Sequence, residues 1–227
     1  MRLAVQHWQG REFVYLTAQA TAGKTAEEQM RDLFRRFESA LKSRGLSLDN
    51  TVRSRIIARD RNGRTEASNV RGEILKGPAR SASSSYIWPD RFDGPALVSF
   101  DLWAARPSTA GAKKTLREYD PVISPLRYCI FESMMHHSGC TSVEPNLEKQ
   151  IDEIVPRISE SLAMAGTSWD KVVRMSFFLH RSQKIDELRR LIGKRVSVNV
   201  PEREVSFVDG YSSEGKLLEV ETTALMP

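Results

Sequence analysis

The chain has 227 residues, of which 40% are hydrophobic and 28% charged, with a net charge of +5 and a sequence pI of about 9.3. This composition excludes a disordered chain, and no apolar run reaches the roughly 18 residues that a membrane span needs. The two cysteines, Cys129 and Cys140, are too few for a disulfide scaffold, and the N-terminus lacks the apolar segment of a secretory signal. We therefore expect a cytoplasmic protein without a membrane partner.

Basic residues are distributed along the chain rather than gathered in one patch. The sequence holds 34 Lys and Arg among 29 Asp and Glu, and its densest basic stretches follow amphipathic patterns. Such stretches are typical of the solvated faces of helices and strands. No P-loop, G-x-G-x-x-G or G-x-S-x-G motif is present, so no nucleotide cofactor is expected. Nucleic-acid binding therefore ranks behind small-molecule binding.

The first half of the chain predicts a strand, a long helix, a strand, a shorter helix and two closing strands. Apolar residues in the long helix recur with the period of one buried face, and Gly45 follows where a helix C-terminus favours a left-handed residue. That apolar stripe consists of Met30, Leu33, Phe34, Phe37 and Leu41. The strands are expected at 12–20, 51–58, 80–88 and 96–104, and the shorter helix at 65–75.

A shift of 121 residues superimposes the second half on the first. The apolar stripe recurs, and polar identities fall on the same register together with the glycine that follows the helix. Two unrelated amphipathic helices would share the apolar period but not the polar residues, so the sequence predicts a tandem duplication. The second stripe is Ile151, Ile154, Val155, Ile158 and Leu162, and the identities include Gln29 with Gln150, Arg53 with Arg174, and Gly45 with Gly166.

Helices that alternate with strands in so small a unit predict an α+β fold, with one mixed sheet and two helices on one face. The predicted domains are residues 1–105 and 125–227, joined by a linker at 106–124 that is rich in Pro, Gly, Ser and Lys. Pro156 is expected to kink the second long helix or to mark its late start. The second domain's strands are expected at 126–134, 171–180, 203–211 and 216–224, and its short helix at 184–195.

Three sets of motifs stand out: ALKSRGLSLDNTVR and SLAMAGTSWDKVVR, PAR and PER before a closing strand, and the closing LLEVETTA. On these motifs each half resembles the reactive-intermediate deaminase (Rid, or YjgF-like) superfamily. The resemblance covers nearly all of both halves outside the linker. It implies two tandem domains of the chorismate-mutase-like fold, with ligand clefts between neighbouring units. It also implies hydrolysis of imines or enamines to a 2-oxo acid and ammonia, with no metal or other cofactor.

The resemblance further implies roles for individual residues. The family's carboxylate-binding arginine matches Arg80 in the first half and Arg203 in the second. The acid that positions the attacking water matches Glu219, whereas Ser99 stands at that position in the first half. The second half thus carries both candidate catalytic residues, Arg203 and Glu219, and Arg80 is a candidate for substrate binding.

The family's S-G-Q segment contacts ligand through its serine. The matching segment is Thr17-Ala18-Gln19 in the first half and Ser133-Met134-Met135 in the second. Thr17 and Ser133 are therefore further candidates for substrate binding.

The residue types suit this chemistry without the resemblance. An arginine offers a planar fork of donors to a carboxylate, and hydrolysis of a C=N bond needs a held anion, a positioned water and a proton-moving group. Glu219 and Glu221 are two residues apart on one strand, so they project to one face, where their pKa values can separate. The alternatives are surface ion pairs for the arginines and the wet face of an edge strand for the acids.

Three functions stay open. The first is an imine or enamine deaminase, and the second is a non-catalytic protein of the same fold that binds small carboxylates or regulates. Ser99 favours the second function for the first half. Nucleic-acid cleavage ranks last, because no pair of catalytic histidines is evident. Chorismate-processing proteins with two domains share this fold, which leaves a ring substrate open.

Two further expectations concern metal binding and assembly. The segment HHSGC contains the adjacent His136 and His137, which point to opposite faces of a strand and make a poor pair of metal ligands. Cys129 is expected to be buried; the exposure of Cys140 is left open, and nothing near it indicates a nucleophile. The resemblance also implies closed rings of three units, and a two-unit chain then gives a homotrimer with six Rid-like units.

Overall fold

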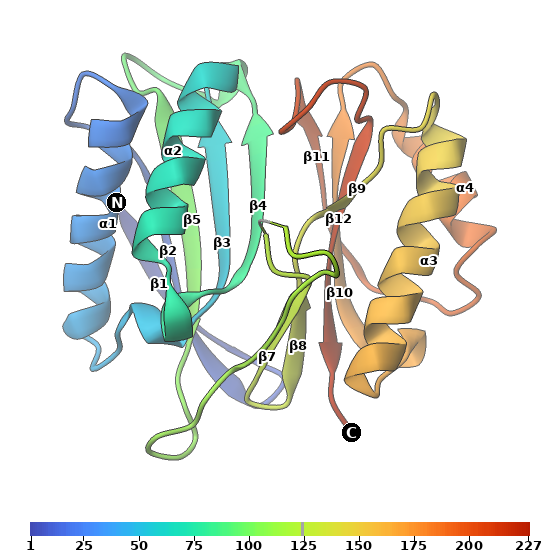
Figure 1. Ribbon diagram of the computed structural model, residues 1–227, viewed down its shortest axis with the longest axis horizontal. Coiled ribbons are helices and arrows are strands. Elements are labelled where there is room, and N and C mark those ends of the chain that lie inside the picture. Colours follow the sequence, from blue (N-terminus) through green and yellow to red (C-terminus); the bar gives the residue numbers. More distant parts are fainter. Residues whose placement is uncertain (124) are drawn as a thin grey trace.

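The computed structural model describes residues 1–123 and 125–227, and the last position of the predicted linker, 124, lies outside the described residues. Two mixed β-sheets face one another in the middle of the molecule, and each carries two helices on its outer face (Figure 1). The predicted α+β fold with two tandem units is therefore confirmed. Within the described residues, no helix is both long enough and apolar enough to cross a membrane.

The first unit consists of β1 (Arg2–Trp8), β2 (Arg11–Gln19), α1 (Ala26–Lys42), β3 (Thr51–Ala58), α2 (Arg61–Ile74), β4 (Ala82–Ile87) and β5 (Val98–Ala105). Its sheet has the order β1-β2-β5-β3-β4, in which β3 and β4 are parallel and the other neighbours antiparallel. The sequence did not predict β1. This edge strand keeps most of its side chains exposed or half-buried, so it lacks a clear apolar alternation.

The second unit consists of β6 (Thr115–Arg117), β7 (Tyr128–Phe131), β8 (Met134–His137), β9 (Cys140–Thr141), α3 (Leu147–Ala165), β10 (Val172–His180), α4 (Ile185–Gly193), β11 (Glu202–Val208) and β12 (Leu218–Leu225). Its sheet has the order β11-β10-β12-β8-β7-β6, and β9 also pairs with β12. The strand β6 falls within the predicted linker and pairs with β7. Because α3 continues through Pro156, the expected late start of that helix is wrong.

The repeated polar residues perform the same structural task in both units. Thr25 caps α1 and Asn146 caps α3, each by accepting a hydrogen bond from a backbone N–H of the first turn. Gln29 accepts from the backbone N–H of Leu97 at 2.8 Å, and Gln150 accepts from that of Leu217 at the same distance. Each glutamine therefore ties its long helix to the loop that enters the last strand of the unit, which explains why this polar residue occurs twice.

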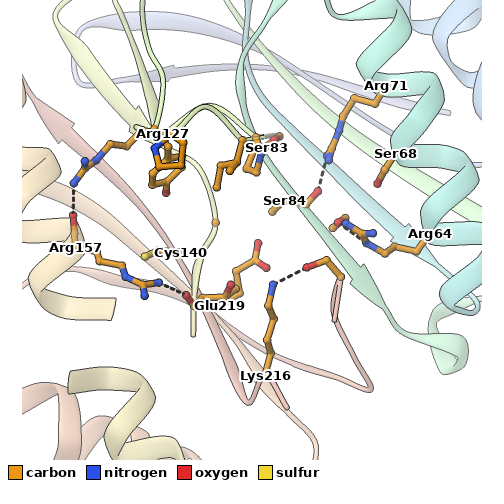
Figure 2. A pocket seen from close by; sticks show the side chains of 18 of the residues that line it. Arg64, Ser68, Arg71, Ser83, Ser84, Arg127, Cys140, Arg157, Lys216 and Glu219 are labelled. Atoms are coloured by element: carbon orange, nitrogen blue, oxygen red, sulfur yellow. Dashed lines mark hydrogen bonds between the residues drawn. The ribbon is translucent and has the colours of Figure 1, made fainter. Parts of the chain in front are cut away.

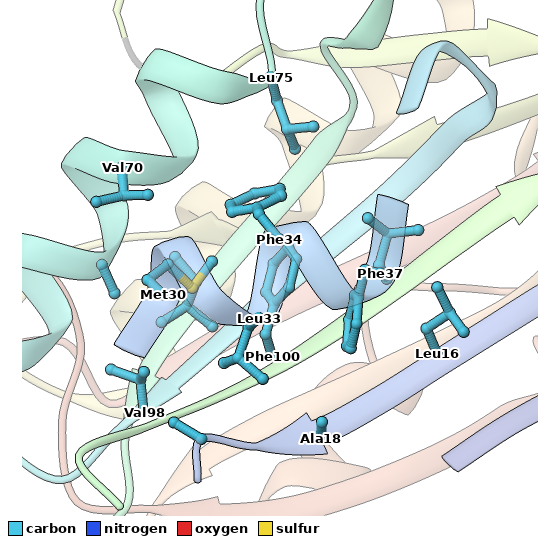
Figure 3. Packing of buried hydrophobic residues seen from close by; sticks show 14 of the residues in the cluster. Leu16, Ala18, Met30, Leu33, Phe34, Phe37, Val70, Leu75, Val98 and Phe100 are labelled. Atoms are coloured by element: carbon cyan, nitrogen blue, oxygen red, sulfur yellow. The ribbon is translucent and has the colours of Figure 1, made fainter. Parts of the chain in front are cut away.

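Each unit has its own apolar core between its helices and its sheet. In the first unit, Phe34 and Phe37 of α1 pack on Phe100 of β5, with ring centroids 4.8 and 5.4 Å apart (Figure 3). All five residues of the predicted stripe in α1 are buried, as are all five in α3. The periodicity thus identified the correct buried face of both long helices.

The space between the two sheets holds charged and aromatic side chains. Arg53 and Arg55 of β3 reach across to Glu221 of β12, at 3.1 and 2.8 Å from its Oε2. All three are buried. Next to them, the ring of Tyr86 stacks on Phe178 with centroids 4.0 Å apart. The inner faces of the two units therefore bury one another through an ion cluster that is flanked by apolar contacts, such as those of Phe13 and Val52 with Met134.

Candidate functional site

A cavity of about 590 Å³ lies between the two units. The first unit contributes α2 and the serine-rich strand β4, and the second contributes α3, β9, β12 and the loops beside them. Figure 2 shows its walls, with Arg64 and Arg71 facing Glu219 and Lys216 across the opening. The cavity is a shared feature of both units, since neither unit forms it alone.

Glu219 is the buried carboxyl of this cavity. It lies on β12 with 6% of its surface exposed, and it rests directly over Gly139. A Cβ at position 139 would lie 1.7 Å from Glu219 Oε1, so only glycine leaves room for the carboxyl in this position. No ion pair to Glu219 occurs among residues 1–123 and 125–227.

The two acids of β12 have opposite electrostatic environments. Burial, and then the neighbouring charge of Glu221, raises the pKa of Glu219 from its usual 4.5 to about 7. Burial also acts on Glu221, but the guanidiniums of Arg55 and Arg53 outweigh it and hold the pKa of Glu221 well below its usual value. The pKa values thus separate as the spacing suggested, and Glu219 is the acid that can carry a proton near neutral pH.

Three cations of the cavity have no acidic partner in the described part of the chain. Arg64 donates to Ser85 Oγ at 2.9 Å, Arg71 to the carbonyl of Ser84 at 2.7 Å, and Lys216 to a serine hydroxyl at 2.6 Å. Burial lowers the pKa of Arg71 to about 10, which still leaves it charged at neutral pH. These neutral partners position the cations without cancelling their charge, so the cavity attracts an anion.

Two more arginines of the cavity are held by acids. Arg127 pairs with Glu160, and Arg157 pairs with Glu153 at 2.8 Å while it donates to the carbonyl of Thr141. These pairs occupy most of the donors on that wall. The free positive charge therefore lies on the side formed by α2 and the loop before β12.

The serines of β4 allow the two units to approach closely. The N–H of Ser83 donates to Ser138 Oγ, and the N–H of Gly139 donates to the carbonyl of Ser83, both at 3.0 Å. Ser84 donates to Glu221 Oε1 at 2.6 Å. Small side chains thus let β4 lie beside the backbone under Glu219, and their hydroxyls line the cavity.

The two arginines predicted from the P-x-R pattern lie outside this cavity. Arg80 precedes β4 and pairs with Glu118, and Arg203 is an exposed residue of β11 near a different cavity. The strand register explains the difference, because Ser84 and Glu204 pair with equivalent positions of β3 and β10. On that register Arg203 is the extra residue of a bulge between Glu202 and Glu204, so it has no counterpart in β4 and is not equivalent to Arg80. The structure therefore does not bring Arg203 together with Glu219.

Thr17 and Ser133 lie in different structural settings. Thr17 pairs with Asp101 of β5 and donates to its Oδ1 at 2.5 Å. Ser133 lies instead in the exposed β7–β8 turn with a positive φ, and Ser138 lies between β8 and β9, which both pair with β12. The match of Ser133 with Thr17 stays a prediction, and the S-G dipeptide of the second half is Ser138-Gly139.

The HHSGC segment contributes a wall of the cavity. His137 shares a hydrogen bond with Ser161 on α3 at 3.0 Å, whereas His136 faces the other sheet beside Phe13. The two rings thus point to opposite faces, as expected for neighbours on a strand. Cys140 lines the cavity and is buried. No cluster of potential metal ligands is found among the described residues.

The fold of the whole chain is similar to that of a solved chorismatase. That structure matches 97% of this chain and 78% of its own length, with a TM-score of 0.65 and 13% identity. A YjgF-family protein from Mycobacterium tuberculosis covers 50% of this chain and 100% of its own, with 18% identity and a TM-score of 0.44. A Rid-family protein from Yersinia pestis covers 50% and 99%, with 22% identity and a TM-score of 0.45.

These comparisons define the class of fold. No protein-family profile matches the chain, and no curated protein matches it. The chain has a chorismatase-like fold built from two tandem α+β units.

Proposed function

We propose that the chain is a hydrolase that releases a 2-oxo acid from a small anionic enamine or enol ether, with Glu219 as the proton donor. The supporting observation is one cavity that combines a buried, protonatable carboxyl with Arg64, Arg71 and Lys216, which have no acidic partner within the described residues. Such a cavity holds an anion next to a group that can move a proton.

Enamines and enol ethers of 2-oxo acids share their first step. Glu219 gives its proton to the terminal carbon of the C=C bond, which leaves an iminium or an oxocarbenium ion beside the substrate carboxylate. The Glu219 carboxylate then accepts a proton from the water that adds to this cation. The adduct loses ammonia from an enamine or an alcohol from an enol ether, and the 2-oxo acid remains. A pKa of about 7 suits an acid that is regenerated in each cycle.

The number of unpaired cations favours a substrate with two carboxylates. One guanidinium suffices for one carboxylate, whereas this cavity offers Arg71 and Arg64 from α2 and Lys216 from the opposite side. The solved structure that spans the chain is named a chorismatase, and chorismate is a cyclic dicarboxylate with an enol-ether bond. A cyclic dicarboxylate of this type therefore deserves the first assay, and the enamine 2-aminoacrylate the second.

The test measures 2-oxo acid release with lactate dehydrogenase and ammonia release with glutamate dehydrogenase. Wild type is expected to release pyruvate from at least one of the two substrates, and Glu219→Gln to abolish it. Arg71→Ala is expected to raise KM, with the surface variant Arg35→Ala as the matched charge control. Binding of the substrates without turnover would instead support a non-catalytic carboxylate-binding protein. Loss of turnover in Arg203→Ala would instead support Arg203 and Glu219 as the catalytic residues, as inferred from the sequence.

The assembly is a separate part of the proposal. Rings of three units require a multiple of three, so a two-unit chain gives a homotrimer with six units as the smallest closed assembly. Light scattering would then report three times the 25.7 kDa of one chain. A mass of 25.7 kDa would show that the face-to-face packing of the two sheets is sufficient without further units.

A further inference from the structure

A second cavity opens between the two sheets, away from Glu219. It has two connected parts of about 310 and 230 Å³, which share Gln6, Tyr15, Trp103 and Arg174. None of its lining residues belongs to the cavity around Glu219. It is therefore a separate space, which the proposed reaction does not use.

Aromatic rings form one wall of this second cavity. Trp8 and Phe13 lie with ring centroids 6.0 Å apart, and Tyr15 and Trp103 lie 5.8 Å apart. The rings come from three adjacent strands, β1, β2 and β5, so they are fixed by the sheet and not by a loop. Such a wall suits a flat ring, which it can contact by stacking and by its edges.

His136 is the unsatisfied polar group of this cavity. Its side chain is buried, and neither ring nitrogen has a hydrogen-bond partner within the described residues. A neutral imidazole has one donor and one acceptor, and burying both without partners is costly. Burial, with the nearby Arg53, lowers the pKa of His136 well below its usual value, so the ring stays neutral. A ligand hydroxyl could serve either nitrogen.

Arg174 and Arg203 provide positive charge in the larger part of this cavity, and Arg55 and Arg91 line the smaller part beside Asp101 and Glu204. Arg174 stacks over the ring of Trp103 with its guanidinium carbon 4.0 Å from the centroid, and Glu204 lies 3.5 Å from its Nη2. Arg203 is exposed at the rim and forms no ion pair within the part of the chain that the structure describes. Arg203 is thus available for an anion, and Arg174 extends the flat aromatic surface.

We propose that this cavity is a second binding site, which takes a small planar aromatic monocarboxylate carrying a hydroxyl group. The carboxylate pairs with Arg203 at the rim, the ring lies against Trp103 and Tyr15, and the hydroxyl bonds to His136. Each group of the ligand matches a feature of the cavity: the carboxylate matches an unpaired cation, the ring a flat wall, and the hydroxyl an unpartnered imidazole. The site does not depend on any activity of Glu219.

The test is calorimetric titration of the full chain with 4-hydroxybenzoate. Arg203→Ala is expected to weaken binding on the order of tenfold, because it removes a charge-assisted contact. His136→Leu, which removes the unpartnered nitrogens and so should fold, is expected to weaken binding of 4-hydroxybenzoate more than that of benzoate. Since the Glu219 cavity also attracts anions, Arg71→Ala is the control and should leave this affinity unchanged.

Three results would overturn the proposal. The first is no measurable binding of 4-hydroxybenzoate to wild type. The second is equal binding of the non-planar cyclohexanecarboxylate, which would remove the role of the aromatic wall. The third is an affinity that falls in Arg71→Ala and not in Arg203→Ala, which would assign the binding to the cavity around Glu219.

Discussion

The two units place different residues at the same position of their last strands. Arg55 pairs with Asp101 in the first sheet, and the equivalent residue of β10, Ser176, pairs with Glu221 in the second. Ser99 of β5 is therefore equivalent to Glu219 of β12. Ser99 is buried with 2% of its surface exposed and lines neither of the two cavities, whereas Glu219 faces the cationic one.

The difference shows how two copies of one sheet can take different roles, one structural and one chemical. Asp101 accepts a hydrogen bond from Thr17 within its own sheet, and Arg55 lies 3.8 Å from it. Glu221 holds two arginines of the other unit. In both units the inner acid is thus structural. Only the second unit has another acid, Glu219, two residues away on the same strand, where the cavity between the units begins.

The sharpest test of this division is to remove Glu219. Under the proposed function, Glu219→Gln keeps the shape of the side chain but removes the proton donor, and kcat should fall by about 10²- to 10⁴-fold. Steady-state 2-oxo acid release measures the loss. Ser99→Ala is the matched control at the equivalent position and should retain full activity, and a similar loss in both variants would contradict the division.

Glu221→Gln should have the largest effect on stability. The substitution leaves Arg53 and Arg55 buried without their shared carboxylate, which should lower the free energy of unfolding by about 3–5 kcal/mol. Chemical denaturation at pH 7 measures it. Asp101→Asn is the comparison in the first unit and should cost less, because Asp101 is the more distant partner of Arg55 at 3.8 Å. Equal losses would mean that both acids support the interface equally.

The fold could be predicted from the sequence because the repeat includes the buried positions of both units. The stripes of α1 and α3 and the paired glutamines follow from local periodicity and from a single shift. β1 and β6 were missed, since an exposed edge strand and a three-residue strand carry almost no periodic signal.

The site was harder to predict because it forms between the units. Glu219 was identified from its strand, but Arg64 and Arg71 lie on a helix of the other unit, where arginines with helical spacing look like a solvated face. Arg203 was placed by a motif whose register differs between the units, since β10 and β11 pair with a bulge. A single sequence contains neither the inter-unit packing nor the bulge.

The raised pKa of Glu219 predicts a pH-dependent cost to stability. Because its pKa rises from 4.5 to about 7 on folding, the native state holds this proton more tightly than the unfolded chain. The stabilisation from this proton is complete below pH 4.5 and is lost as the pH rises through about 7. The total loss in the free energy of unfolding is roughly 3 kcal/mol. Glu219→Gln should therefore be more stable than wild type at pH 8.5 and nearly equal to it at pH 5. Thermal unfolding at both pH values measures this, and no gain at pH 8.5 would show that the carboxyl is already well solvated.

The smallest expected effect concerns the glycine beneath Glu219. In Gly139→Ala the added Cβ would lie 1.7 Å from Glu219 Oε1, and because that atom is the end of a flexible side chain, the carboxyl should move rather than the backbone. A displaced proton donor should lower kcat by about 10- to 100-fold, while the free energy of unfolding changes by about 1 kcal/mol or less. Gly193→Ala, whose Cβ meets no heavy atom within 4 Å, is the matched control and should leave kcat unchanged. If Gly139→Ala retained full activity, the position of Glu219 over Gly139 would have no part in the reaction.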